Sequence, residues 1–214
     1  MNLNSTNRKY TRIIIIGGAF ICFAYLAYMV TTRQVLAFDT VIRQWAYGLR
    51  NPVLNAVFIT ITYLGNWQTI TAIGLILLLV KQTRRDIGLP FAAVSLSSTL
   101  IYKIVKSIFA RPRPELSVRI IEQGGYSFPS GHSMNGLVCF GILIYLIRRY
   151  CKNRKAADFL TVLLSVLIIA IGCSRVYVGV HFPTDILAGW SLGTAYLCIS
   201  IIILEKLRGE RNAL

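Results

Sequence analysis

The sequence predicts an all-α, polytopic membrane protein built as a bundle of six transmembrane helices. Of its 214 residues, 55% are hydrophobic and only 14% are charged, whereas a soluble domain typically carries about 25% charged residues. The apolar residues also form long uninterrupted blocks, as helices that cross a bilayer do. No linker, internal repeat or low-complexity tract divides the chain, so we expect residues 1–214 to form a single membrane-embedded domain.

The apolar blocks place the six spans. The first block, residues 13–31, follows basic residues as in a signal peptide, but it is long for one and no small-residue cleavage site follows, so an uncleaved span is expected. The second block, residues 53–80, contains Gly65–Asn66. A helix from Trp67 alone would be short for a hydrocarbon core of about 30 Å, so upstream turns contribute or the helix is broken. The other spans are expected at residues 87–109, 133–147, 159–173 and 185–204.

Residues 38–49 differ from these blocks because their apolar side chains recur at helical spacing. One face carries apolar residues and the other carries polar ones: Phe38, Val41, Ile42, Trp45, Ala46 and Leu49 against Asp39, Arg43 and Gln44. This pattern predicts an amphipathic helix in the first outer loop that lies in the membrane interface. A plain connecting helix with one packed face explains the pattern equally well.

The basic residues predict the orientation of the chain. There are 23 Lys and Arg against 8 Asp and Glu, a net charge of +15. In a soluble protein this excess would suggest nucleic acid, but membrane proteins collect Lys and Arg in cytoplasmic loops, so no nucleic-acid partner is expected. One side, predicted to be cytoplasmic and to hold both termini, carries Arg8, Lys9, Arg12, Lys81, Arg84, Arg85, Arg148, Arg149, Lys152, Arg154, Lys155, Lys206, Arg208 and Arg211.

Three polar segments interrupt the apolar pattern, and the predicted topology places all of them on the outer face. They are residues 106–114 (KSIFARPRP), 126–132 (YSFPSGH) and 174–185 (SRVYVGVHFPTD). Charged residues at membrane ends often only snorkel to the interface, which is a sufficient explanation for Lys103 and Arg119. It does not explain why both histidines of the chain fall in these segments.

The residue types in these segments suit a phosphate group. Lys106, Arg113 and Arg175 can clamp a tetrahedral dianion, because arginine offers a planar fork of donors and lysine a compact charge. Ser130 and Gly131 precede an apolar helix, whose free backbone N–H groups and dipole favour an anion. Gly131 lets the backbone approach the ligand closely.

The two histidines can divide the chemistry between them. His181 and Asp185 are four residues apart, so the carboxylate is within reach of the imidazole. A hydrogen bond to one ring nitrogen would fix the tautomer and leave the other nitrogen as a nucleophile. His132, from another segment, can protonate the leaving oxygen and later activate water.

A metal site is the alternative for the same side chains. His132, His181 and Asp185 contain the donors of a two-histidine, one-carboxylate triad. However, the three cationic side chains in the same cluster would repel a divalent ion. The five cysteines form no C-x-x-C pair either. We therefore predict no metal and no other cofactor.

The three motifs K-x6-R-P, P-S-G-H and S-R-x5-H-x3-D, in this order, resemble those of the type 2 phosphatidic acid phosphatase superfamily. Every motif position is matched, by Lys106 with Arg113–Pro114, by Pro129 to His132, and by Ser174–Arg175 with His181 and Asp185. The resemblance implies a six-helix bundle with its site at the outer face and no metal requirement. It implies a phosphohistidine intermediate on His181, oriented by Asp185, with His132 as acid and then base. It also implies that the phosphate is bound by Lys106, Arg113, Ser130, Gly131 and Arg175.

The expected function is therefore a lipid phosphate phosphatase of a bacterial plasma membrane, with the bilayer and its lipid substrate as its partners and no obligate protein partner. The small first outer loop resembles bacterial members that act on phosphatidylglycerophosphate or undecaprenyl pyrophosphate; phosphatidate is a further candidate. A lipid phosphotransferase would share the phosphoenzyme, and the motifs do not separate it from a hydrolase. A haloperoxidase relative would typically be soluble, and a non-catalytic lipid-binding relative would have lost a histidine or the aspartate.

Overall fold

The computed structural model describes residues 3–33 and 35–211, and the side chains of residues 10–33 and 35–209. Arg8, Lys9 and Arg211, which contributed to the predicted orientation, lie outside the described side chains. Every regular element of the described chain is a helix or a helical turn. Its elements are α1 (Leu3–Arg33), α2 (Ala37–Gly48), α3 (Pro52–Leu64), α4 (Trp67–Leu79), α5 (Lys81–Thr83), a π-helical turn η1 (Arg84–Gly88), α6 (Leu89–Phe109), a 3-10 turn η2 (Leu116–Val118), α7 (Gly131–Tyr150), α8 (Arg154–Tyr177) and α9 (Pro183–Arg211).

The predicted all-α bundle with six spans is confirmed. Five helical segments of the described chain are long and apolar enough to cross a membrane alone: Tyr10–Arg33, Lys81–Phe109, Gly131–Tyr150, Arg154–Tyr177 and Pro183–Gly209. The sixth span is the pair α3 and α4, bent by 47°. The bend falls at Gly65–Asn66, where the sequence allowed a broken helix. Asn66 has an extended backbone, with φ of −73° and ψ of 156°, so the helical hydrogen bonds stop there and restart in α4.

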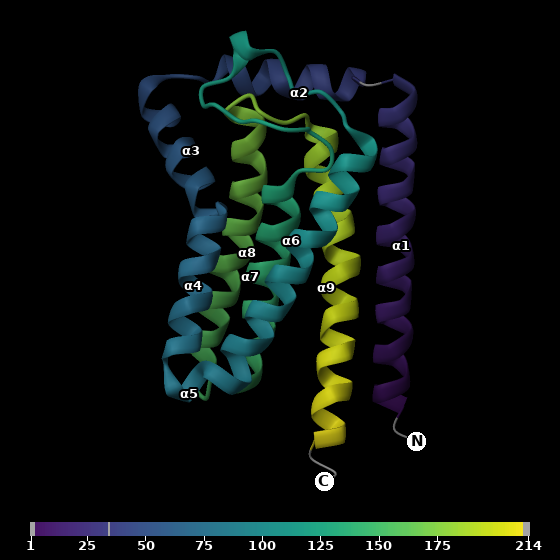
Figure 1. Ribbon diagram of the computed structural model, residues 1–214, viewed down its shortest axis with the longest axis vertical. Helices are drawn as coiled ribbons and strands as arrows, with labels where there is room; N and C mark the ends of the chain where they lie inside the picture. The colour runs from purple at the N-terminus through teal and green to yellow at the C-terminus, as the bar shows by residue number, and fades with distance from the viewer. Residues whose placement is uncertain (1–2, 34, 212–214) are drawn as a thin grey trace.

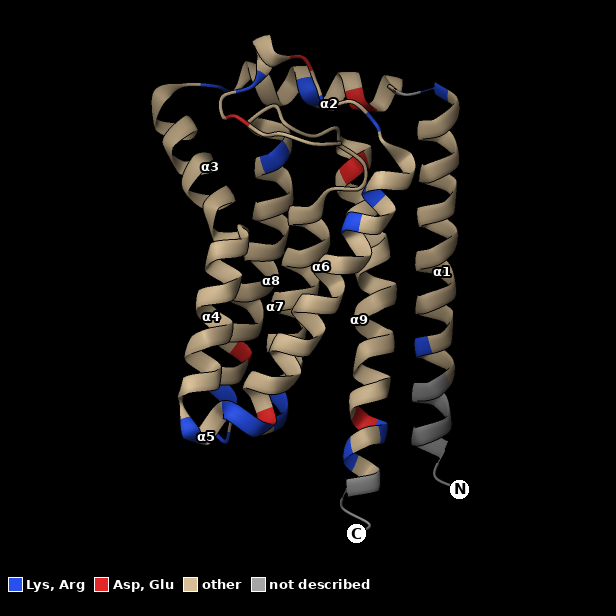
Figure 2. Cartoon of the chain, viewed as in Figure 1, with Lys and Arg blue, Asp and Glu red and all other residues tan. Residues whose placement is uncertain are grey.

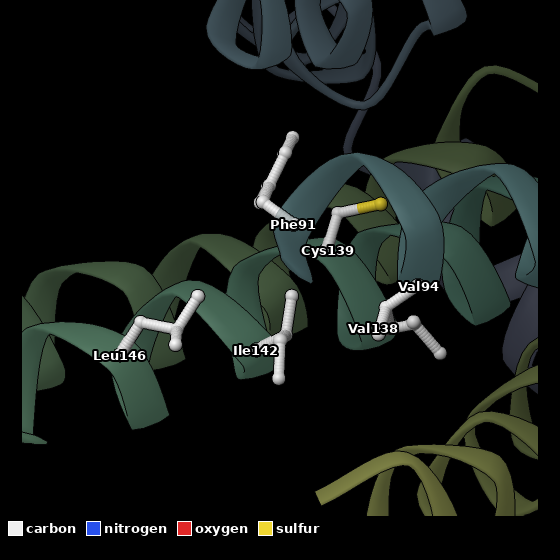
Figure 3. Close-up of a cluster of buried hydrophobic side chains, with 6 residues drawn as sticks. All are labelled: Phe91, Val94, Val138, Cys139, Ile142 and Leu146. Atoms are coloured by element: carbon white, nitrogen blue, oxygen red, sulfur yellow. The ribbon is translucent and has the colours of Figure 1, made fainter. Parts of the chain in front are cut away.

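The helices pack around α7 (Figure 1). This helix contacts α6, α8 and α9, while α1 runs along α9 and α3 lies against α8. Figure 3 shows the largest buried cluster, in which α6 supplies Phe91 and Val94 and α7 supplies Val138, Cys139, Ile142 and Leu146. Lipid tails are as apolar as these side chains, so close packing and dispersion, rather than escape from water, hold the helices together here.

Polar side chains also tie α6 to α7 inside the bundle. The amide of Asn135 accepts from Ser98 Oγ at 2.8 Å and donates to Thr99 Oγ1 at 3.0 Å. Cys139 Sγ donates to Ser95 Oγ at 3.2 Å. Hydrogen bonds between membrane helices are worth about 1 kcal/mol each. They fix the register of the two helices that carry two of the three polar segments.

Charged residues are concentrated near the two ends of the bundle (Figure 2). Both ends of the described chain lie at the end opposite α2 (Figure 1). There Arg12 donates to Glu205 at 2.5 and 2.9 Å, which joins α1 to α9. The common location of both chain ends agrees with the predicted topology. Which compartment that end faces remains a prediction.

Helix α2 lies across the other end of the bundle, roughly perpendicular to the spans (Figure 1). Its apolar residues Val41 and Trp45 are 62% and 67% exposed, so they do not form a packed face against the protein. Asp39, on the polar face of this helix, is fully buried, whereas Gln44 on the same face is exposed. The polar face of α2 therefore meets Arg111 and Thr184 at Asp39 and solvent at Gln44. Contact of α2 with the membrane interface remains a prediction.

Candidate active site

The three polar segments converge beneath α2, although they come from different helices. A cavity of about 640 Å³ opens there. The predicted site residues that line it are Lys106, Arg113, Gly131, His132 and His181. Farther along, the cavity runs between α4 and α6 past Leu75, Leu78, Phe91 and Leu96. The other predicted residues, Ser130, Arg175 and Asp185, do not line the cavity and are buried behind its wall.

His181 lies between a carboxylate and a guanidinium. Its Nδ1 is 3.2 Å from Asp185 Oδ2, and its Nε2 is 3.0 Å from Arg113 Nη1. A guanidinium can only donate hydrogen bonds, so in the neutral imidazole Nε2 must be the acceptor and Nδ1 must carry the hydrogen. The lone pair on Nε2 is therefore held on the cavity side of the ring, next to Arg113.

Burial and neighbouring charge keep the His181 ring neutral. The side chain is 1% exposed. Burial, and then the positive charges of Arg113 and Lys106, lower the pKa of His181 well below its ordinary value. Burial also lowers the pKa of Arg113, to about 10. Because this value is still well above 7, the guanidinium stays charged at neutral pH. The site thus combines a neutral imidazole with a fixed positive charge.

Asp185 is held by donors on both carboxylate oxygens. Oδ2 accepts from the backbone N–H of Phe182 at 2.8 Å and from the hydroxyl of Ser127, in addition to His181. Oδ1 accepts from Arg111 Nη1 at 2.6 Å. A fully buried carboxylate stays ionised only with such partners. The orientation of the His181 ring therefore depends on a network that reaches beyond the predicted residues.

Arg111 links that carboxylate to α2. Its Nη2 donates to Asp39 Oδ2 at 2.9 Å, and Asp39 also accepts from Thr184 N and Thr184 Oγ1, each at 2.9 Å. The guanidinium lies 4.0 Å from the centre of the Phe182 ring. Sequence reasoning missed Arg111, Asp39 and Ser127. The only available signal was the first arginine of the R-P-R-P stretch, two residues before Arg113.

The other arginine of the predicted site is buried and largely paired. Arg175 donates to Thr62 Oγ1 at 2.6 Å and to Gln123 Oε1 at 2.7 Å. Its buried Nε has no hydrogen-bond partner within the described residues. Arg113 donates to the carbonyls of Gly124 and Gly125 at 3.1 and 3.0 Å. Uncharged oxygens thus accept from both guanidinium groups, but only Arg113 lines the cavity, while the charge of Arg175 lies behind its wall.

The start of α7 forms the floor of the site. Ser130 is its N-cap and accepts from Ser133 N at 3.3 Å, so the predicted phosphate ligand also has a capping role. Gly131 lines the cavity, and a Cβ there would lie 2.8 Å from the ring of Tyr102. The first backbone N–H groups of a helix have no partner inside it. This helix start therefore presents its positive end to the cavity.

His132 faces the cavity from the first turn of α7. Its Nε2 lies 2.6 Å from Oδ1 of Asn66, a residue that sequence reasoning did not include in the site. His132 and His181 thus lie on the same cavity and are each bonded to a different partner. Among the described side chains, those of residues 10–33 and 35–209, no group of three or more His, Cys, Asp or Glu is placed to hold a metal ion. Metal independence remains a prediction.

The fold and the site together define an integral membrane protein with a cationic, two-histidine site at one end of a six-span helical bundle. The model of the PAP2 superfamily matches residues 87–208. The chain belongs to this superfamily. The matched segment includes all three motifs that carried the resemblance.

Curated and solved relatives agree with this assignment. The chain is 34% identical to phosphatidylglycerophosphatase B of Bacillus subtilis, over 90% of this chain and 96% of the relative. It is 31% identical to undecaprenyl-diphosphatase of Sulfolobus acidocaldarius, over 70% of each chain. A crystal structure of a transmembrane PAP2-type phosphatidylglycerolphosphate phosphatase from Bacillus subtilis superposes with a TM-score of 0.78 at 32% identity, covering 89% of this chain and 96% of that one.

Proposed function

We propose that this protein is an integral membrane phosphatase that hydrolyses a phosphomonoester or pyrophosphate of a membrane lipid through a phosphohistidine intermediate. The observation that carries the proposal is the geometry of His181. Asp185 holds its Nδ1, and its Nε2 lies beside Arg113 at the cavity that Lys106 and His132 also line. The relatives named phosphatidylglycerophosphatase B and undecaprenyl-diphosphatase support the same reaction class.

The first chemical step transfers phosphate to the enzyme. The Nε2 lone pair of His181 attacks phosphorus, an N–P bond forms and the P–O bond to the lipid breaks. His132 donates a proton to the leaving oxygen. Negative charge on the phosphoryl oxygens is stabilised by Lys106, Arg113 and Arg175, aided by Ser130 and the backbone of Gly131 at the start of α7.

The second step frees the enzyme. His132, which has lost its proton, takes one from water; the water oxygen attacks phosphorus and the N–P bond breaks. Inorganic phosphate leaves and His181 is again neutral. Asp185 keeps its hydrogen bond to His181 Nδ1 throughout and stabilises the positive charge that His181 carries while phosphorylated.

The shape of the cavity supports a lipid substrate. Its polar part holds the site, and the continuation between α4 and α6 is lined by apolar side chains such as Leu75, Leu78 and Leu96. Pockets for amphiphiles combine a large apolar surface with a few placed polar groups. Phosphate release from phosphatidylglycerophosphate, phosphatidate and undecaprenyl pyrophosphate by the purified protein tests the proposal. Turnover of none of them by the wild type, or equal turnover by His181→Ala, would contradict it.

We further propose that the site faces outward from a bacterial plasma membrane and that both termini are cytoplasmic. The basic residues flanking the opposite end support this orientation. Glu122 is exposed at the site end and Lys152 at the opposite end. In a Cys151→Ser background, an impermeant thiol reagent should label Glu122→Cys in intact cells and Lys152→Cys only after permeabilisation. The reverse pattern would invert the topology.

A further inference from the structure

The break in the second span brings an amide side chain onto the ring of His132. Asn66 Oδ1 lies 2.6 Å from His132 Nε2, although the two residues belong to different helices. Asn66 stands directly before α4, where an asparagine normally accepts from the backbone of the first helical turn. Within the described chain its side chain makes no such capping bond. The amide is therefore directed away from its own helix and toward the histidine.

The neighbouring glycine makes this approach possible. A Cβ at Gly65 would lie 2.6 Å from Ile171 Cγ2 and 3.2 Å from His132 Cδ2. Any larger residue would push the break away from α8 and from the imidazole. Helices α3 and α4 meet at this break with a bend of 47°. Gly65 and Asn66, the two residues of the break, both line the cavity. Both residues of the break thus pack against the His132 side of the site.

We propose that Asn66 is a positioning residue for His132: its Oδ1 accepts a hydrogen bond from Nε2–H and leaves Nδ1 as the nitrogen that exchanges protons in the cavity. An amide oxygen can only accept, so the bond selects one tautomer of the neutral ring. The inference rests on the proposed function, in which His132 serves as acid and then as base.

The chemistry of the two steps explains why the partner is neutral. His132 must give its Nδ1 proton to the leaving oxygen and later take one from water, so it passes through both protonation states in each cycle. An amide oxygen accepts from Nε2–H in both states. A carboxylate, such as the one that holds His181, would instead favour the charged ring. Asn66 therefore orients the ring in both states and favours the charged one less than a carboxylate would.

Kinetics with two leaving groups test the inference. A lipid alkoxide needs a proton as it leaves, whereas the phenolate of 4-nitrophenyl phosphate does not. We expect Asn66→Leu to slow phosphoenzyme formation from the lipid phosphate by about 100-fold, the lower range for general acid catalysis. With 4-nitrophenyl phosphate, the burst of 4-nitrophenol should keep its rate within about threefold, while the steady state after the burst slows by about 100-fold because activation of water is lost.

Two matched variants serve as controls. Asn66→Asp keeps an acceptor for Nε2–H and should restore most of the rate of phosphoenzyme formation from the lipid phosphate, in which His132 acts as an acid. The steady-state rate after the burst should recover less, because a carboxylate favours the charged ring. Asn55 lies in the same span, accepts from Tyr177 Oη at 2.8 Å and does not line the cavity. Asn55→Leu should change both substrates equally or not at all. Elution of each variant at the wild-type volume in detergent verifies that it folds.

The outcomes separate the inference from the proposed function. Equal slowing of phosphoenzyme formation from both substrates by Asn66→Leu, no slowing with either, or no rescue by Asn66→Asp would overturn the inference while His181→Ala is still inactive. If His181→Ala retains wild-type turnover, the proposed function fails first. The double variant Asn66→Leu/His132→Ala should be no slower than His132→Ala, because the two residues then act as one unit.

Discussion

The two histidines occupy walls of the cavity that differ in their construction. The wall of His181 is ionic: Arg111 joins the buried carboxylates of Asp185 and Asp39, which draws α2 into the site. The wall of His132 is neutral: a bent span presents the amide of Asn66. The difference fits the proposed roles. A nucleophile that becomes positively charged benefits from a fixed carboxylate, whereas a residue that alternately gains and loses a proton benefits from a partner that accepts in both states.

Replacing the carboxylate on the ionic wall should have the largest effect on activity. Asp185→Asn preserves size but offers an amide to the donors that now meet the carboxylate, so the His181 tautomer is no longer fixed. We expect kcat to fall by about 10⁴-fold, as in other histidines that lose their orienting aspartate. Steady-state phosphate release measures this. A loss smaller than that of Asn66→Leu would reverse the proposed difference between the walls.

The buried ion pairs of Arg111 should also contribute more to the free energy of unfolding than an exposed ion pair does. Arg111→Leu leaves two buried carboxylates without their shared cation, which should lower the free energy of unfolding by about 3–5 kcal/mol. Arg148→Leu is the matched control, because it removes an ion pair with Asp158 in which both side chains are exposed and should cost less than about 1 kcal/mol. Unfolding in detergent compares the two variants. Similar values for both would show that the buried network does not stabilise α2 against the bundle.

The pH dependence of stability should reveal the buried neutral imidazole. Burial lowers the pKa of His181 in the folded protein, while the unfolded value is about 6.5. Below that pH the unfolded chain binds a proton that the folded chain does not, so this stabilisation is complete above about pH 6.5 and is lost as the pH falls toward the folded pKa. The slope from this residue is at most about 1.4 kcal/mol per pH unit. His181→Gln should flatten the curve of unfolding free energy between pH 6.5 and 5 by about this amount; an unchanged slope would indicate a charged ring.

Removal of divalent cations should have the smallest effect. Neither wall depends on a metal in the proposed chemistry, so EDTA should change phosphatase activity by less than about twofold, while vanadate, which adopts the geometry of the transition state, should inhibit it. A magnesium-free assay with and without added Mg²⁺ serves as the control. Loss of activity with EDTA that is restored by one metal would instead support the alternative in which His132, His181 and Asp185 bind a metal ion.

The bundle and the cavity-facing residues could be predicted because both follow from local patterns in the sequence. Long apolar blocks located the spans, Gly65–Asn66 indicated the break, and the three polar segments lie at helix ends that the topology brings together. The partners that hold these residues were not predictable in the same way. Asp39 and Thr184 are 145 positions apart, and Asn66 and His132 are 66 apart. Contacts of this kind arise only from how the helices pack.

Asp39 illustrates the limit of periodicity. The spacing of residues 38–49 shows which side of the helix is polar, and the structure contains that helix as α2. The same spacing does not reveal what the polar side meets. Asp39 lies under the helix in the ionic network, while Val41 and Trp45 point away from the protein. A polar face can thus bind charged groups of its own protein as readily as it can face solvent.

Detection of the phosphoenzyme tests the central claim most directly. The purified protein is mixed with a lipid phosphate, quenched within milliseconds and digested, and the peptide that contains His181 is analysed by mass spectrometry under conditions that preserve phosphohistidine. We predict phosphate on His181, stable in base and labile in acid, and its absence from His181→Ala. Phosphate on another residue, or wild-type turnover by His181→Ala, would contradict the account.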